Sequence, residues 1–187
     1  MSTRGVYGFR IDGMDKLSYN HSNSYPQSLG YHIAEDALIL ATLGAPAKLR
    51  DKVRAITMVT YQTVPTPELI KATGPYHNLN VSEQSTQDMY CLFRGAQGNI
   101  FAALRLGVML DSNDFILNSL LCEWGYIINL DDWTLEAWEG FQTWPTEGNR
   151  YGVDGTEDGY YPCKLSYSVS LDALDPQKFV AAVRKDN

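Results

Sequence analysis

The stretch EWGYIINLDDWTLEAWEGF, residues 123–141, carries the clearest structural pattern in this chain of 187 residues. Large apolar side chains alternate from Trp124 to Leu130, as they do in a β-strand that buries one face. An acidic pair then offers a turn, and Thr134–Phe141 continues as a second strand. The stretch therefore predicts a β-hairpin.

A second hairpin is predicted near the N-terminus. Gly5–Ile11 mixes aromatic and β-branched residues with small ones, Asp12-Gly13 favours a tight turn, and Lys16–Asn20 resumes the strand. The two hairpins, Gly5–His21 and Glu123–Phe141, provide most of the strand pattern in the chain. We therefore expect them to pair in one sheet.

The segment between the hairpins is predicted to be mostly helical, because apolar residues recur there at a spacing of three and four. Thr66-Pro67 is typical of a helix start, and Ser85 with Asp88 resembles a capping box. Farther along, Lys164–Leu171 alternates like a further strand. We expect helices that begin near Ile33, Pro46, Pro67, Ser85, Ile100 and Pro176.

Strands at both ends and helices between them predict an α+β fold. The expected architecture is a single antiparallel sheet built from the N- and C-terminal hairpins, with the helical middle segment packed on it. The length suits one domain over residues 1–187. The polar loop Trp144–Gly159 is long enough to predict a functional or mobile segment.

The composition is that of an ordinary globular protein, with 44% hydrophobic and 20% charged residues. A formal net charge of -7 repels a phosphate backbone on average, which disfavours general nucleic-acid binding. No apolar run approaches the length of a membrane span, and Met1–Arg4 contains no apolar core of a signal peptide. We expect no membrane association and a cytoplasmic location.

The sequence predicts neither a metal site nor a cofactor. His21, His32 and His77 are the only histidines, and none lies within helical reach of another. Glu136 and Glu139 fall on opposite faces of a strand, so each is predicted to be a solvated sheet position. The cysteine spacing matches no metal or redox motif, and reduced, buried thiols are expected. The cysteines are Cys91, Cys122 and Cys163.

A run of polar side chains follows the first hairpin and is the best candidate for a binding site. Aromatic rings stack on bases or sugars, hydroxyls and amides orient a ligand, and arginine binds phosphate or carboxylate. We expect a non-catalytic protein that binds a small molecule, with a nucleotide-like metabolite as the favoured ligand. The candidate residues are Arg4, Arg10, Tyr19, Asn20, His21, Ser22, Ser24, Tyr25 and Arg94.

Recognisable motifs open the chain: Thr3–Arg10, then Tyr19-Asn20-His21 and Ser24-Tyr25-Pro26. They resemble the opening of a group of uncharacterised bacterial and bacteriophage proteins, and the resemblance continues through Cys122-Glu123-Trp124 to Tyr160-Tyr161-Pro162. The group has no assigned activity, so the resemblance implies an origin and not a mechanism. That origin is a bacterium or a phage-infected bacterium, where small phage proteins often act by binding host molecules.

Other interpretations stay open. The polar run fits a hydrogen-bonded turn that holds the sheet to the first helix. Removal of the initiator methionine would expose Ser2, or Thr3 after further trimming, as the nucleophile of an N-terminal nucleophile amidohydrolase. A protein-interaction module would use Trp124, Trp138 and Trp144, and a homo-oligomer is a further alternative.

Overall fold

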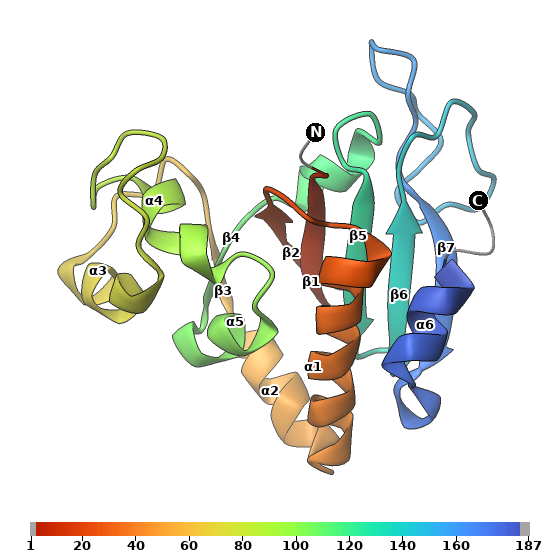
Figure 1. Ribbon diagram of the computed structural model, residues 1–187, viewed down its shortest axis with the longest axis horizontal. Coiled ribbons are helices and arrows are strands. Elements are labelled where there is room, and N and C mark those ends of the chain that lie inside the picture. The colour runs from red at the N-terminus through yellow and green to blue at the C-terminus, as the bar shows by residue number, and fades with distance from the viewer. Residues whose placement is uncertain (1–2, 184–187) are drawn as a thin grey trace.

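The structure is a computed structural model that describes residues 3–183. It has an α+β fold built on a five-stranded sheet with the strand order β2-β1-β5-β6-β7 (Figure 1). Both predicted hairpins are present and belong to this sheet, which confirms that the two ends of the chain supply the strands. The strands are β1 (Gly5–Ile11), β2 (Met14–Asn20), β5 (Trp124–Asn129), β6 (Thr134–Glu139) and β7 (Lys164–Ser170).

The sheet is mixed, so the expectation of a purely antiparallel sheet is wrong at one junction. The hairpins join through β1 and β5, which run parallel from the pair Gly5 and Trp124 to the pair Arg10 and Asn129. The helical segment between them returns the chain to the same end of the sheet, as a parallel pair requires. Side-chain alternation reports which face of a strand is buried and carries no information about the direction of its neighbour.

One face of the sheet is covered by helices. In Figure 1, α1 and α6 lie in front of the strands, and the main core forms between these helices and the sheet. Phe9 and Ile128 from the sheet are fully buried there, together with Ile33 of α1 and, at 1% exposure, Phe179 of α6. The helices are α1 (Tyr31–Thr42), α2 (Pro46–Ala55), α3 (Pro67–Thr73), α4 (Met89–Phe93), α5 (Ile100–Leu106) and α6 (Pro176–Val183).

Short helical turns connect the longer elements. The turn η1 follows the polar run and leads directly into α1. Asp88 is the N-cap of α4, because its side chain accepts a hydrogen bond from the backbone N–H of Tyr90 at 2.8 Å. The short turns are η1 (Pro26–Gly30), η2 (Gly74–Tyr76), η3 (Arg94–Ala96), η4 (Asn113–Leu117) and η5 (Leu171–Ala173).

The second face of the sheet is covered by η4 and by the long loop between β6 and β7. Val6 and Trp138 point to this face and pack in a cluster with Ile116 of η4 and Cys163. All three cysteines are buried and free, as the sequence predicts.

A small lobe lies beside the edge strand β2 and was not predicted as such. Its two-stranded parallel sheet consists of β3 (Thr57–Val59) and β4 (Val108–Leu110) and packs with α3, α4 and α5. Figure 1 shows this lobe to the left of the main sheet. The backbone N–H of Ser112 donates to the carbonyl of Leu17 at 2.9 Å, which attaches the lobe to β2. The lobe and the edge strand therefore face each other across a narrow boundary.

Candidate functional site

Part of the predicted polar run holds its own loop in shape. The side-chain amide of Asn20 donates to the carbonyl of Ser22 at 2.6 Å and to the hydroxyl of Ser24 at 2.8 Å. Ser24 is fully buried, and its carbonyl accepts a hydrogen bond from the hydroxyl of Tyr126 at 3.0 Å. Asn20 and Ser24 are therefore used to join β2 to the start of α1, as the hydrogen-bonded-turn interpretation requires.

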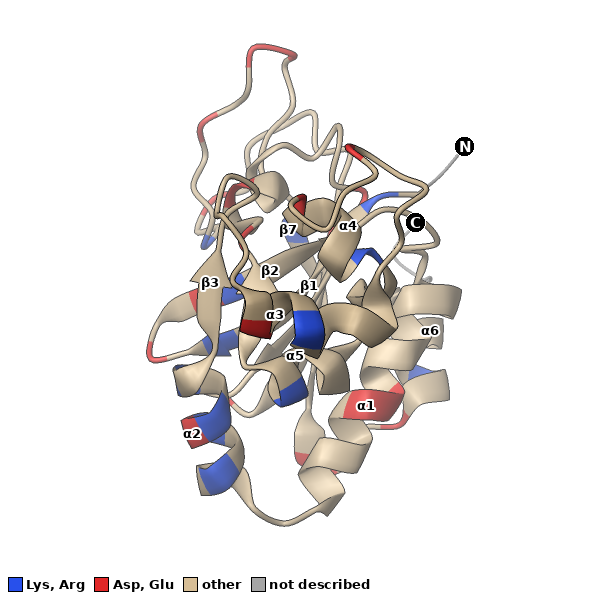
Figure 2. Ribbon diagram, turned by 90° about the vertical axis from the view of Figure 1, so that its left-hand side faces the viewer, with Lys and Arg blue, Asp and Glu red and all other residues tan. Residues whose placement is uncertain are grey.

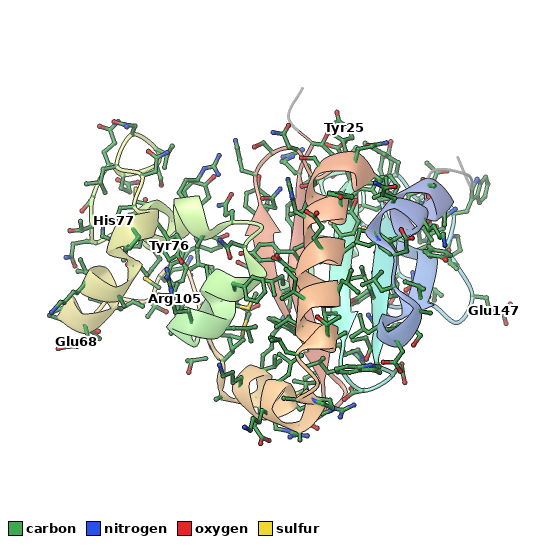
Figure 3. The ribbon with its side chains drawn as sticks, turned by 60° about the horizontal axis from the view of Figure 1, so that its bottom comes forward. Tyr25, Glu68, Tyr76, His77, Arg105 and Glu147 are labelled. Carbon is green, nitrogen blue, oxygen red and sulfur yellow. The ribbon has the colours of Figure 1, made fainter. Side chains whose placement is uncertain are left out.

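Tyr25 lies apart from the other candidates. Its side chain is 46% exposed, and Figure 3 shows it at the periphery of the molecule. Asn20 and Ser22 also line a polar hollow of about 560 Å³ with Gln97 and Asn99, on the side of the loop that faces α1. The polar run thus separates into a structural part, an exposed part and one aromatic residue, Tyr19, that lines a different surface.

Tyr19 lines a cleft between the main sheet and the small lobe. Three further aromatic rings surround it, and we call this feature the aromatic cleft. The centroids of the Tyr19 and Phe115 rings are 5.0 Å apart in an edge-on arrangement, and those of Tyr61 and Tyr90 are 6.3 Å apart. The cleft has a volume of about 470 Å³ and is lined by Tyr19, Tyr61, Tyr90, Asp111, Ser112, Asp114, Phe115 and Asn118.

A cationic corner lies beside Tyr19. The hydroxyl of Tyr19 is 3.1 Å from Nδ1 of His21. Desolvation and then the positive charges of Arg94 and Arg4 lower the pKa of His21 below its ordinary value. The pairing of β1 with β2, in which Gly5 is opposite Asn20, places Arg4 across from His21. Arg94 is near because its Nη1 and the backbone N–H of His21 donate to the same side-chain oxygen of Gln97. At neutral pH the corner therefore consists of two arginines and a neutral imidazole.

Within residues 3–183, the guanidinium groups of the two arginines of this corner form no ion pair. The Nη1 of Arg94 donates to the side-chain oxygen of Gln97 at 3.0 Å, and the same oxygen accepts from the backbone N–H of His21. The carboxylate of Glu123 accepts a hydrogen bond from the backbone N–H of Arg4 at 3.2 Å, but it forms no ion pair with the guanidinium group. Such guanidinium groups can bind an external anion.

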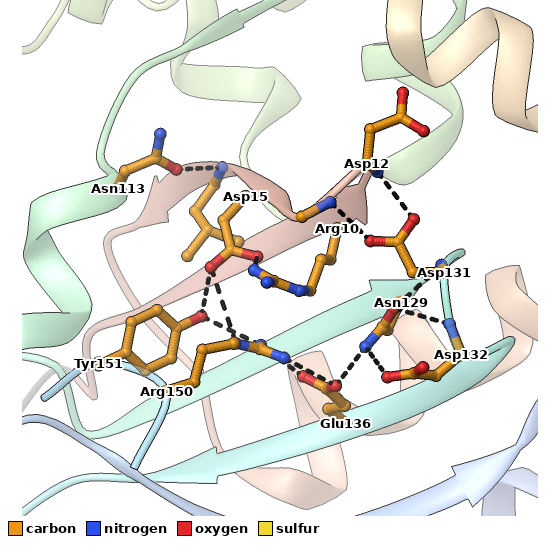
Figure 4. A network of polar contacts seen from close by, with 12 residues as sticks. Arg10, Asp12, Asp15, Asn113, Asn129, Asp131, Asp132, Glu136, Arg150 and Tyr151 are labelled. Atoms are coloured by element: carbon orange, nitrogen blue, oxygen red, sulfur yellow. Dashed lines mark hydrogen bonds and ion pairs between the residues drawn. The ribbon is translucent and has the colours of Figure 1, made fainter. Parts of the chain in front are cut away.

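Arg10 is not part of this corner. Six residues of extended strand, about 20 Å, separate it from Arg4, and its Nη1 forms an ion pair with Asp15 at 2.9 Å. The expected approach of Arg10 to the polar run therefore does not occur. The residue belongs instead to a network on the second face of the sheet, at the opposite end of β1 (Figure 4).

Glu136 is the centre of that network and is 4% exposed, so its prediction as a solvated position is wrong. Its carboxylate accepts hydrogen bonds from both terminal nitrogens of Arg150, at 3.1 and 2.6 Å, and from Asn129 at 2.7 Å. Burial raises the pKa of Glu136, but these hydrogen bonds outweigh it, and the net pKa is lowered. Tyr151 donates to Asp15 at 2.8 Å and links the network to β2.

This network fastens the long loop to the sheet. Arg150 also lies 4.6 Å from the centroid of the Trp138 ring, and Tyr151 packs edge-on against the same ring. Strand alternation could not predict the network, because Arg150 lies in a loop whose sequence shows only that it is polar. Because Arg150 pairs with the carboxylate of Glu136 in β6, the positive and the negative charge each have a partner.

The residues of the alternative interpretations are mostly inaccessible. Thr3 is 2% exposed, and Ser2 lies outside the described residues. Trp124 and Trp138 are 9% and 3% exposed and belong to the core, so only Trp144, at 79%, offers a surface to a partner.

Tyr61, Tyr90 and Phe115 are functional candidates that the sequence analysis missed. They come from the segment after β3, from α4 and from η4, and no local pattern connects them. Within residues 3–183, no three His, Cys, Asp or Glu side chains gather in a way that would hold a metal ion. Over the same residues, no helix combines the length and apolarity of a membrane span. Comparisons with known protein families, curated proteins and solved structures find no match for the chain.

Proposed function

We propose that the protein binds a small anionic metabolite with an aromatic ring, and that a nucleotide-like compound is the favoured ligand. The aromatic cleft would hold the ring, and the cationic corner would hold the anionic group. The observation that supports this proposal most directly is that the guanidinium groups of Arg4 and Arg94 form no ion pair within residues 3–183. Strand register places Arg4 across from His21, and Arg94 shares the Gln97 oxygen with the His21 backbone, so both residues belong to the end of β2 that carries Tyr19.

The chemistry of the lining suits the parts of a nucleotide. Stacking on a tyrosine ring contributes about 1–3 kcal/mol per base, and Tyr61 is 39% exposed and accessible for it. Guanidinium groups bind phosphate through paired hydrogen bonds. Asp111 and Asp114 line the cleft and offer carboxylate oxygens that accept hydrogen bonds from sugar hydroxyls.

The proposed role is binding without chemical change to the ligand. The hydroxyl, amide and carboxylate groups that line the cleft orient a ligand, and the cleft lies between two parts of the fold, as many ligand sites do. In the proposed role the protein sequesters the metabolite, which removes it from other users in the cell.

Calorimetric titration with a panel of nucleoside mono- and diphosphates tests the proposal, combined with mass spectrometry of small molecules released from the purified protein on denaturation. Arg94→Ala and Tyr61→Ala should each weaken binding by at least about tenfold, which is 1.4 kcal/mol. Lys71→Ala and Tyr25→Ala are matched controls, because both side chains are exposed and lie outside the cleft.

The controls should bind as the wild type does. If the wild type neither releases nor binds any compound of this class, the cleft is not a nucleotide site. If binding occurs but survives both cleft variants, the ligand occupies another surface and the assignment to the cleft is wrong.

A further inference from the structure

An apolar groove lies where the end of α1, the start of α2 and the length of α5 meet. It has a volume of about 560 Å³, within the range of small-molecule sites. Leu43 and Phe101 on its wall are 68% and 38% exposed, although both are large and apolar. The apolar side chains that line the groove are Leu40, Leu43, Ala45, Leu49, Phe101 and Leu104.

The charged residues that line this groove are all basic. Lys48 and Lys52 come from α2 and Arg105 comes from α5, while no carboxylate belongs to the lining. Lys48 and Lys52 are one helical turn apart, so their ammonium groups can reach the same anion. Because the whole chain has a net charge of -7, this concentration of positive charge is a local feature and not an average property.

The other basic residues of α2 have partners within the protein, which distinguishes them from the two lysines. The Nε of Arg50 donates to the carbonyl of Leu130 at 3.0 Å, and the guanidinium of Arg54 forms an ion pair with Asp12 at 2.7 Å. Lys48 and Lys52 make no hydrogen bond or ion pair with any residue in 3–183. Figure 2 shows the basic positions of α2 together on one side of the molecule.

We propose that the groove binds the anion of a fatty acid, a second ligand independent of the one in the aromatic cleft. The alkyl chain would lie on the exposed leucines and Phe101, where burial removes apolar surface from water on both partners. The carboxylate would lie between Lys48 and Lys52, whose ammonium groups donate charge-assisted hydrogen bonds. The apolar floor and the basic rim match the two ends of such a molecule.

Other occupants fit these observations less well. A second copy of the chain would also carry a net charge of -7, and two such chains repel each other on average. An amphipathic acidic helix would need a longer apolar track than a hollow of this volume offers.

Calorimetric titration of the protein with dodecanoate, kept below its micelle-forming concentration, tests the proposal. We expect saturable binding of one molecule per chain, roughly tenfold weaker binding of the uncharged analogue dodecanol, and none of acetate. The double variant Lys48→Gln/Lys52→Gln should weaken dodecanoate roughly tenfold and leave dodecanol unchanged. Lys71→Gln is the matched control, because this exposed lysine of α3 lies outside the groove.

A second pair of variants tests the apolar wall. Leu43→Ser should weaken both dodecanoate and dodecanol, while Val64→Ser, at a side chain 79% exposed and outside the groove, should weaken neither. Arg94→Ala should leave dodecanoate binding intact, which separates this site from the aromatic cleft. The proposal is wrong if dodecanoate shows no saturable binding. It is also wrong if Lys48→Gln/Lys52→Gln binds dodecanoate as tightly as the wild type does. A wild-type dimer in sedimentation that becomes a monomer in Leu43→Ser would likewise overturn the proposal, because a second copy would then occupy the groove.

Discussion

At the scale of single residues, the pairing of Arg150 with Glu136 is the interaction whose loss should cost most. Removal of one partner of a buried ion pair leaves a charge without compensation. We expect Arg150→Met to lower the free energy of unfolding by about 3 kcal/mol. Urea unfolding at neutral pH measures this. Arg54→Met is the comparison. The ion pair of Arg54 with Asp12 is about half exposed and should contribute less than about 1 kcal/mol to the free energy of unfolding.

The pair of Arg150 and Glu136 also predicts how the free energy of unfolding depends on pH. The folded-state pKa of Glu136 is lowered, so its contribution to stability is present above the unfolded-state pKa and is lost as the pH falls through the folded-state pKa. In Arg150→Met, burial without the cation should raise that pKa instead. The destabilisation by the variant should therefore shrink as the pH is lowered from 7 toward about 4. A difference that stays constant with pH would contradict this assignment.

At the scale of elements, the β1–β2 hairpin depends on Gly8. A Cβ atom added there would lie 2.0 Å from the carbonyl oxygen of Lys16 on the paired strand. We expect Gly8→Ala to force the strands apart and to lower the free energy of unfolding by about 3 kcal/mol. Gly13→Ala, in the turn of the same hairpin, should cost only about 1 kcal/mol, because it meets a positive φ of 74° but no neighbouring atom within 4 Å. Thermal unfolding distinguishes the two, and equal losses would contradict the steric explanation.

The junction between α2 and β2 depends on Lys16. Its ammonium group donates to the carbonyls of Val53, Arg54 and Ile56, at 2.9, 2.9 and 2.6 Å, and so caps the C-terminus of α2. We expect Lys16→Met to lower the free energy of unfolding by roughly 1–2 kcal/mol. Chemical denaturation measures the change, and Lys52→Met on the same helix should leave stability almost unaltered. A result in which both variants behave alike would show that the cap contributes nothing.

The elements also show how far the sequence could predict this protein. Both hairpins were predictable because alternation and turn residues act within a few positions. The parallel pairing of β1 with β5 was not predictable, since it depends on the path that the chain takes through the helices between them. Of the candidate site, the sequence predicted Tyr19, His21 and the two arginines, Arg4 and Arg94. Tyr61 and Phe115 join them through tertiary packing that no local pattern encodes.

At the scale of the whole molecule, the small lobe should be less stable than the main sheet. Strand β5 is paired on both sides and buried along its whole length, whereas β3 pairs only with β4 and is half exposed. Segments with few buried contacts open at lower free energy. We expect amide hydrogen exchange, followed by mass spectrometry, to be slowest in β1 and β5 and faster in β3 and α3. Uniform protection would mean that the lobe and the sheet open as one unit.

The parallel pairing of β1 with β5 also has a consequence for synthesis on the ribosome. The N-terminal hairpin emerges first, but the neighbour of β1 does not exist until residues 124–129 have been translated. Until then, the inner edge of β1 exposes unpaired backbone groups beside Tyr7, Phe9 and Ile11, which are buried in the finished protein. A nascent chain that stalls before residue 124 therefore carries an open, apolar strand edge, and we expect the chain to be most prone to aggregation at this stage.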